Sequence, residues 1–203
     1  MTGAARAADQ GLTVELFGGS ALQAQTKLEV RQEGQPDLRF TARWETHPFT
    51  DSPYYSWRVG LWNGRSGWEL QLTHHKAYLG NPTPEIEHFE ISHGYNLVTF
   101  GHAWRLANGF VVRAGAGPVI THVEATIRGL YGTDSGTTFG GGYDLSGATV
   151  MLGVGRTLHI VGGLGASLGV NLSGSWVKVK IAEGTATVPN VALHGQVGLG
   201  YTF

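Results

Sequence analysis

The side chains best suited to chemistry are concentrated in one stretch, residues 73–96. Among its bases, acids and phenols are His74, His75, Lys76, Tyr78, Glu85, Glu87, His88, Glu90 and His93. Imidazole can accept a proton or bind a metal ion near neutral pH, and a carboxylate can orient the imidazole for either task. A hydrolytic centre in this stretch would take its catalytic residues from His74, His75, Glu85 and His93.

Neither a nucleophile nor a coordination geometry follows from the spacing of these residues. The chain has no cysteine, which excludes thiolate chemistry. In an extended segment, alternation places His75 on the same face as Glu69 and Gln71, while His74 lies on the other face. We therefore expect no metal site and no cofactor, and we interpret the histidines as a rim in contact with water and lipid phosphates.

The elements around this stretch are predicted to be β-strands. Segment 191–203 carries its apolar side chains on one parity: Val191, Leu193, Val197, Leu199, Tyr201 and Phe203. This period of two indicates a strand with two unlike faces. Similar alternation predicts about ten strands, near 12–19, 25–33, 38–47, 54–62, 68–79, 88–106, 110–128, 145–156, 158–181 and 190–203. The count is eight if the first two segments form one bent element or an extension outside the main sheet. Between two of the later strands, the pair Asn108-Gly109 predicts a tight type I′ hairpin.

The composition indicates that water does not cover the whole surface. Only 14% of the 203 residues are charged and 32 are glycine, whereas soluble domains carry about 25% charged residues. No apolar run reaches the ~18 residues of a membrane helix, so only alternating strands could cross a bilayer. A net charge of −1 gives no basis for binding nucleic acid. We expect one domain at 11–203, preceded at 1–10 by a disordered stub that is either a mature start or the remnant of a removed export signal.

The content of the polar face predicts which side of the sheet is inside. A soluble barrel would carry Lys and Glu outside on most strands, whereas the late strands here offer mainly Gly and Ser on the polar parity. Charges of mixed sign are predicted to pair in the lumen, because buried charges persist only when they are compensated. This lumenal network comprises Glu15, Arg31, Arg39, Arg43, Glu45, Arg58, Glu69 and Arg113. The apolar parity then faces lipid, and the sheet must close because an open edge in hydrocarbon leaves backbone groups unsatisfied.

The predicted fold is therefore all-β, a closed antiparallel transmembrane β-barrel with up-and-down connections and about ten strands, or eight. Aromatic rings are expected at both membrane boundaries. These girdle residues are Trp44, Trp57, Trp68, Trp104, Trp176 and Tyr201. Three basic residues, Lys76, Lys178 and Lys180, are expected at anionic lipid headgroups.

With Tyr201 and Phe203 on the apolar parity of its last strand, the chain resembles the small outer-membrane β-barrel proteins of Gram-negative bacteria. The resemblance extends over nearly the whole chain through its alternating strands and girdle aromatics. It implies export through the periplasm, integration in the outer membrane, and contact with outer-membrane lipids and lipopolysaccharide. It also implies that the barrel-assembly machinery recognises Tyr201 and Phe203. We expect a monomer.

Residues 73–96 are also distantly similar to the outer-membrane lipid A deacylases, which carry a His followed closely by a Ser nucleophile, then an Asn-rich loop and a carboxylate. Lys76 and Ala77 stand where that Ser would be sought. We therefore expect a barrel without enzymatic activity whose charge-filled lumen is largely closed, and which acts as a structural or surface-binding protein through its extracellular loops. The alternatives are a narrow passive pore and a lipid A (lipopolysaccharide) hydrolase that uses the His and Glu cluster.

Overall fold

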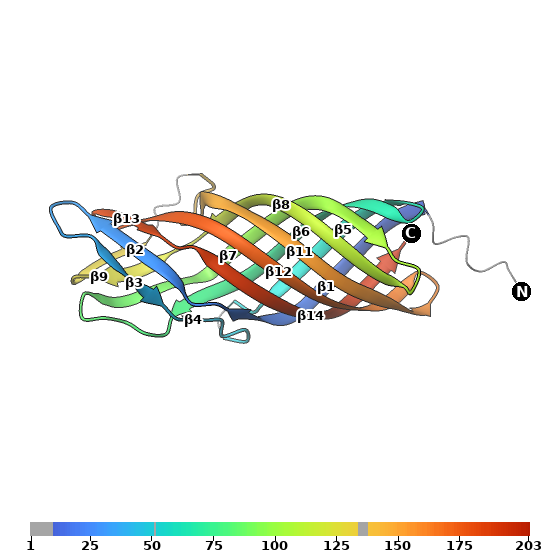
Figure 1. The fold of residues 1–203 in the computed structure, drawn as a ribbon, viewed down its shortest axis with the longest axis horizontal. Coiled ribbons are helices and arrows are strands. Elements are labelled where there is room, and N and C mark those ends of the chain that lie inside the picture. The colour runs from blue at the N-terminus through green and yellow to red at the C-terminus, as the bar shows by residue number, and fades with distance from the viewer. Residues whose placement is uncertain (1–9, 51, 134–137) are drawn as a thin grey trace, which may run out of the picture.

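Eight long antiparallel strands form a closed ring (Figure 1). The computed structural model describes residues 10–50, 52–133 and 138–203, so the expected stub at 1–10 lies outside it except for Gln10. The ring strands are β1 (Gln10–Gln23), β5 (Tyr55–Asn63), β6 (Ser66–Leu79), β7 (Ile86–Arg105), β8 (Phe110–Thr121), β11 (Asp144–Val161), β12 (Leu164–Ile181) and β14 (Asn190–Thr202). Each pairs with the next along the chain, and β14 closes on β1. The predicted closed meander is confirmed.

Six shorter strands extend the sheet beyond the ring at one end. They are β2 (Thr26–Gln32), β3 (Leu38–Ala42), β4 (Trp44–Glu45), β9 (Glu124–Ile127), β10 (Leu130–Thr133) and β13 (Gly184–Thr187). Strands β13, β2 and β3 continue from β12, while β9 and β10 continue from β7. We call this extension, with the adjoining ends of β6, β7 and β12, the outer head. The segments expected at 25–33 and 38–47 as barrel strands lie here, which reduces ten strands to eight.

The polarity of the two faces is inverted along β12. Between Ser167 and Ser175 the inward side chains are small and polar, and the outward ones are apolar and exposed. Beyond Trp176 the inward side chains are Val177, Val179 and Ile181, all buried, while Lys178 and Lys180 lie outside. A lipid-facing segment must be apolar outside, whereas a water-exposed sheet must bury its apolar face. The boundary of the membrane on the side of the outer head therefore lies near Trp176.

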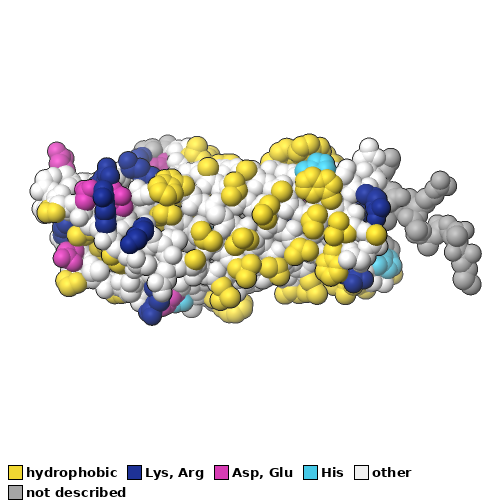
Figure 2. Space-filling model, in the orientation of Figure 1, with side chains coloured by type: hydrophobic (Ala, Val, Ile, Leu, Met, Phe, Trp, Pro, Cys, Tyr) yellow, Lys and Arg dark blue, Asp and Glu magenta, His cyan; other side chains and the backbone are white. Residues whose placement is uncertain are grey.

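The exposed apolar band has the height of a bilayer core. On β12 it extends from Leu164, which pairs with Tyr201, to Trp176. A strand rises about 3.3 Å per residue and tilts by about 40°, so this span covers roughly 30 Å along the barrel axis, close to a ~25 Å apolar band with its aromatic girdles. Figure 2 shows hydrophobic side chains spread over the barrel, while acidic side chains and many of the basic ones gather on the outer head. Among the described residues, no helix is long and apolar enough to cross a membrane.

Gln10, the first residue that the structure describes, and the C-terminal Phe203 lie at the end of the barrel opposite the outer head, which we call the inner end (Figure 1). The ring strands are connected there by short turns next to the pairs Asn63↔Ser66, Arg105↔Val111 and Val161↔Leu164. The predicted hairpin at Asn108-Gly109 exists, but only Gly109 has a positive φ, whereas a type I′ turn needs two. The turn instead has three residues, with Leu106 accepting from Gly109 N–H and donating to Phe110 O.

Candidate functional site

Four charged side chains from four ring strands meet in the middle of the lumen. Arg58 Nη1 lies 2.9 Å from Glu15 Oε2, and Arg113 Nε lies 2.8 Å from Glu69 Oε2. Arg58 Nε also donates to Gln71 Oε1 at 3.0 Å and lies 3.7 Å from Glu69 Oε2, which joins the two pairs. The four side chains are at most 9% exposed. With two positive and two negative charges, the cluster is neutral, and it joins β1, β5, β6 and β8 inside the barrel.

A layer of neutral hydrogen-bonding groups lies above these charges, toward the outer head. His194 contacts Tyr54 OH through Nδ1 at 3.1 Å, and Ser173 Oγ through Nε2 at 2.8 Å. Gln196 donates to Tyr54 OH and accepts from Asn171. His194 thus serves as a hydrogen-bonding filler of the lumen.

The outer head closes the barrel with an apolar core. Its buried members come from both sides of the extension and are Leu28, Val30, Ala42, Trp44, Ala77, Ile86, Phe89, Ile91, Tyr95, Leu97, Val119, Val123, Ala125, Ile127, Val177, Val179, Ile181, Ala186 and Val188. Hydrogen bonds join the strands of the head: Trp44 Nε1 donates to Thr26 Oγ1 at 2.7 Å, and Arg128 donates to Gln32 and Pro36. At the inner end, a cavity of about 260 Å³ lined by Trp62, Arg105 and Tyr201 reaches Glu15 and Arg113. The lumen is therefore accessible from the inner end and blocked above.

The other four charges predicted for the lumen lie outside the barrel. Arg31, Arg39, Arg43 and Glu45 are on the water-facing side of the outer head, with 41–61% of each side chain exposed. That prediction is wrong for these residues because the outer head buries its apolar face and turns its charges outward. Arg31 and Arg39 instead form an exposed ladder with Glu29, and their hydrogen bonds hold the pKa of the Glu29 carboxyl below its usual value.

The predicted girdle divides into two levels, with two exceptions, Trp57 and Trp44. Trp176 marks the outer boundary, and Trp68, Trp104 and Tyr201 lie exposed toward the inner end, where Trp68 stacks on Phe100 at 5.2 Å. Trp57 lies within the lipid-facing band, paired with Leu72. The prediction is wrong for Trp44, which is 4% exposed, because the apolar face of its segment points into the head.

The three lysines predicted at lipid headgroups have two different environments. Lys178 and Lys180 lie on the outward row above Trp176, and Lys180 Nζ pairs with Asp144 Oδ2 at 2.9 Å. Lys76 is fully buried and donates to Thr50 O. It occupies a bulge between His75 and Ala77, which turns its side chain away from lipid. The headgroup prediction is therefore wrong for Lys76.

The four candidate catalytic residues do not converge. His75 is fully buried beside Tyr95 and His194, whereas His74 lies against the ring of Tyr55. Glu85 is exposed near the tip of the head and accepts from Thr83 Oγ1 at 3.2 Å. His93 lies beside Glu124 and lines the same surface hollow as His74, but neither His75 nor Glu85 lines that hollow. No substrate could contact all four groups at once, so these residues do not form a catalytic site for the proposed hydrolase.

Ser92, His93 and Glu124 are close together but cannot act as a catalytic triad. Ser92 Oγ and Glu124 Oε1 both lie 3.2 Å from the same nitrogen of His93, Nδ1. A triad needs the nucleophile at one ring nitrogen and the acid at the other. Ser92 is also only 1% exposed. The arrangement is a local hydrogen-bonding cluster.

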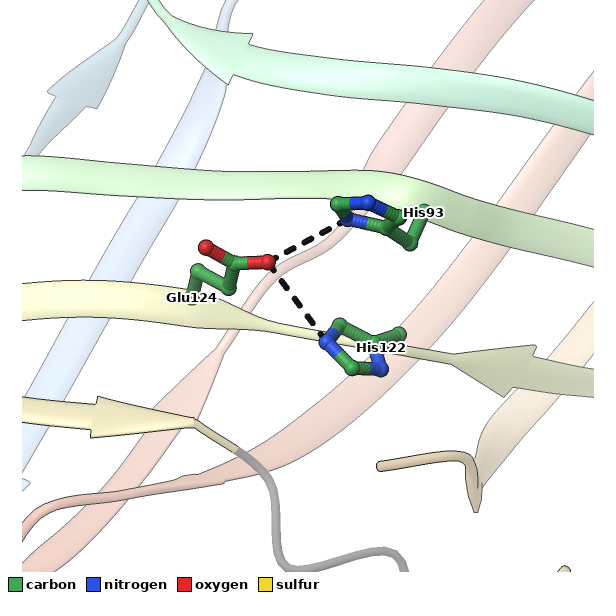
Figure 3. Close-up of side chains that lie close together, drawn as sticks. All are labelled: His93, His122 and Glu124. Carbon is green, nitrogen blue, oxygen red and sulfur yellow. Dashed lines mark ion pairs between the residues drawn. The ribbon is translucent and has the colours of Figure 1, made fainter. Parts of the chain in front are cut away.

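Among the residues that the structure describes, one group of possible metal ligands is assembled, although the sequence predicted no metal site. His93 comes from β7, Glu124 from β9, and His122 from the link between β8 and β9 (Figure 3). Glu124 Oε1 lies 3.2 Å from His93 Nδ1 and 3.6 Å from His122 Nε2, and all three donor atoms lie within 4.8 Å of one another. His122 and Glu124 were missed, although the segment Thr121–Glu124 places both on one face of an extended chain.

Solved structures of similar shape are outer-membrane proteins. The outer-membrane protein AlkL has a TM-score of 0.51 at 11% identity, covering 96% of this chain and 91% of AlkL. OprG from Pseudomonas aeruginosa has a TM-score of 0.50 at 9% identity, covering 95% of this chain and 96% of OprG. The attachment invasion locus protein Ail of Yersinia pestis has a TM-score of 0.42 at 13% identity, covering 95% of this chain and 99% of Ail. This chain has the fold of a small outer-membrane β-barrel.

No protein-family model matches the sequence, and a comparison with curated proteins found no relative. At such low identity the likeness to AlkL and OprG concerns the fold alone. The barrel's activity therefore has to be argued from its own lumen and outer head.

Proposed function

We propose that this protein is a non-conducting barrel of the bacterial outer membrane that acts through the surface of its outer head. The observation that carries the proposal is the double closure of the lumen. The Glu15, Arg58, Glu69 and Arg113 cluster fills the middle of the barrel, and the apolar core of the head lies above it. An eight-stranded barrel has an interior just wide enough for its side chains.

The outer head suits a binding role because it is rigid and polar outside. Its two sides share an apolar core, and its water-facing side carries paired charges such as Glu29 with Arg31 and Arg39. Lys178 and Lys180 lie just beyond the girdle residue Trp176, and lysine side chains near a membrane boundary can extend their ammonium groups to lipid phosphates. We propose anionic groups of lipopolysaccharide as their partner in the membrane, with the chain exported through the periplasm and inserted as a monomer.

Conductance across a planar bilayer tests the closed lumen. The purified barrel is expected to give no channel steps, while a general porin reconstituted in the same bilayer gives them. Discrete steps whose size scales with salt concentration would show an open path and overturn the proposal in favour of a narrow pore. The lipid contact is tested separately, by comparing lipopolysaccharide retained on the folded wild type and on Lys178→Ala. Equal retention would remove Lys178 from the contact.

A further inference from the structure

A group of nitrogen and oxygen donors on the outside of the head is independent of the lumen and of the proposed function. It consists of His93 Nδ1, His122 Nε2 and Glu124 Oε1, which converge from adjacent segments (Figure 3). Their side chains are 49%, 17% and 25% exposed, respectively. An ion could therefore reach the donors from water without opening the barrel.

The spacing of the donors agrees with a coordination shell. A tetrahedral ion with bonds of about 2.1 Å holds its donor atoms about 3.4 Å apart. The separations of 3.2 Å and 3.6 Å from Glu124 Oε1 to the two histidine nitrogens bracket this value. The two nitrogens lie within 4.8 Å of each other, so a small ring rotation brings them to the required separation.

The local backbone holds the three residues in place. Gly94, with φ of +141°, lies where β7 changes its partner from β8 to β9, and its carbonyl accepts from His122 N–H at 3.2 Å. Tyr143 OH donates to the carbonyl of His93 at 2.8 Å, and its ring lies 5.3 Å from that of His122. A Cβ on Gly142 would lie 2.2 Å from Cε1 of His122, so this glycine lets the loop pack directly on the imidazole. The site is therefore fixed by the fold before an ion arrives.

The surrounding charge favours a cation. Glu90 is the direct cross-strand partner of Glu124, and opposite residues in an antiparallel pair place their side chains on the same face. The Glu90 carboxylate pairs with His88 at 3.2 Å, so it adds negative charge on this face without being one of the three ligands. Nitrogen ligands select ions of the zinc type over calcium and magnesium, which prefer all-oxygen shells.

We propose that His93, His122 and Glu124 bind one divalent transition-metal ion of the zinc class on the outer surface of the barrel. Three protein ligands leave at least one position open to water or to a group on another molecule. The outer head would then present an exposed Lewis-acidic ion to the medium.

The test uses the full chain without a polyhistidine tag, folded in detergent micelles and titrated with zinc chloride in a calorimeter. One ion per chain is expected for the wild type, and a large excess of Mg²⁺ or Ca²⁺ should not displace it. Loss of an outer-shell partner already costs about 10–100-fold in metal affinity, so His93→Gln and His122→Gln should weaken binding by at least that factor. The matched control is His159→Gln, which removes an exposed histidine that contacts Gly162 O at the inner end and should leave affinity unchanged.

Cobalt(II) provides a second measurement, because its visible absorption reports the ligand shell directly. The wild type is expected to give d–d bands that disappear in His122→Gln, and the heat-modifiable mobility of each variant verifies that it is folded. A wild type that binds no zinc would overturn the proposal, as would folded His93→Gln and His122→Gln proteins that bind as tightly as His159→Gln.

Discussion

Removing Arg58 should destabilise the barrel more than removing any exposed arginine. Its guanidinium contacts Glu15 Oε2 at 2.9 Å, Gln71 Oε1 at 3.0 Å and Glu69 Oε2 at 3.7 Å, and its side chain is 3% exposed. After Arg58→Ala, the hydrogen bonds left to Glu15 are those from the hydroxyls of Ser167 at 2.6 Å and Thr157 at 3.4 Å, and Arg113 is the positive charge that still interacts with it. A buried carboxylate that loses its counter-charge costs about 3–5 kcal/mol. This corresponds to a fall of about 150- to 5,000-fold in the folding equilibrium constant.

The assay is equilibrium unfolding by urea in phospholipid vesicles, followed by tryptophan fluorescence. Arg39→Ala is the matched control, because Arg39 is 61% exposed and pairs with Glu29 and Asp37 at the surface, where a salt bridge contributes less than about 1 kcal/mol. Adding Glu15→Gln to Arg58→Ala should recover part of the loss, since it removes the uncompensated charge. If Arg58→Ala and Arg39→Ala unfold at the same urea concentration, the lumenal network does not hold the barrel together as argued.

Three further outcomes follow from the two faces of the sheet. Val170→Arg places a charge near the middle of the lipid-facing band and should cost about 2–4 kcal/mol in the same urea titration; an effect below 1 kcal/mol would contradict the assigned depth. Val179→Asp buries an unpaired carboxylate in the head core, so the head should become sensitive to protease while the barrel stays folded; an equally resistant head would contradict the core. The pKa of Glu29 is depressed by Arg31, so the ionised carboxylate stabilises the head at pH values above its unfolded-state pKa. That contribution is lost as the pH falls through the pKa of Glu29 in the folded protein. Carboxyl NMR should show the pKa of Glu29 rising in Arg31→Ala, and no rise would refute the pairing.

Alternation was sufficient to predict the ring because each lipid-facing strand must separate hydrocarbon from a polar lumen. The same rule located the four charges that do converge, Glu15, Arg58, Glu69 and Arg113. It failed for Arg31 and its neighbours because parity defines two faces without stating which solvent each one meets. Beyond Trp176 water replaces lipid, and the meaning of the two faces is exchanged.

The metal-ligand group shows a different limit of prediction from the sequence. Counting pairs outward from the turn at Gly109 gives Arg105↔Val111 and later Tyr95↔Thr121, and continuing that count sets His93 opposite Val123, between His122 and Glu124. The proximity was thus available from the hairpin register. The change of partner at Gly94 and the packing of Gly142 on His122 were not, because they depend on segments distant in the chain.

The exchange of faces along β12 also determines how deeply the protein sits in the bilayer. Sliding β12 by one residue against β11 and β14 would draw Lys178 and Lys180 into the dry interior while pushing Val177 and Val179 into water. The same slip would turn Leu172 toward the polar lumen and Ser173 toward the lipid acyl chains. A shift in register is thus unfavourable both in lipid and in water. The point along β12 where the two faces exchange therefore also sets the depth of the barrel in the bilayer.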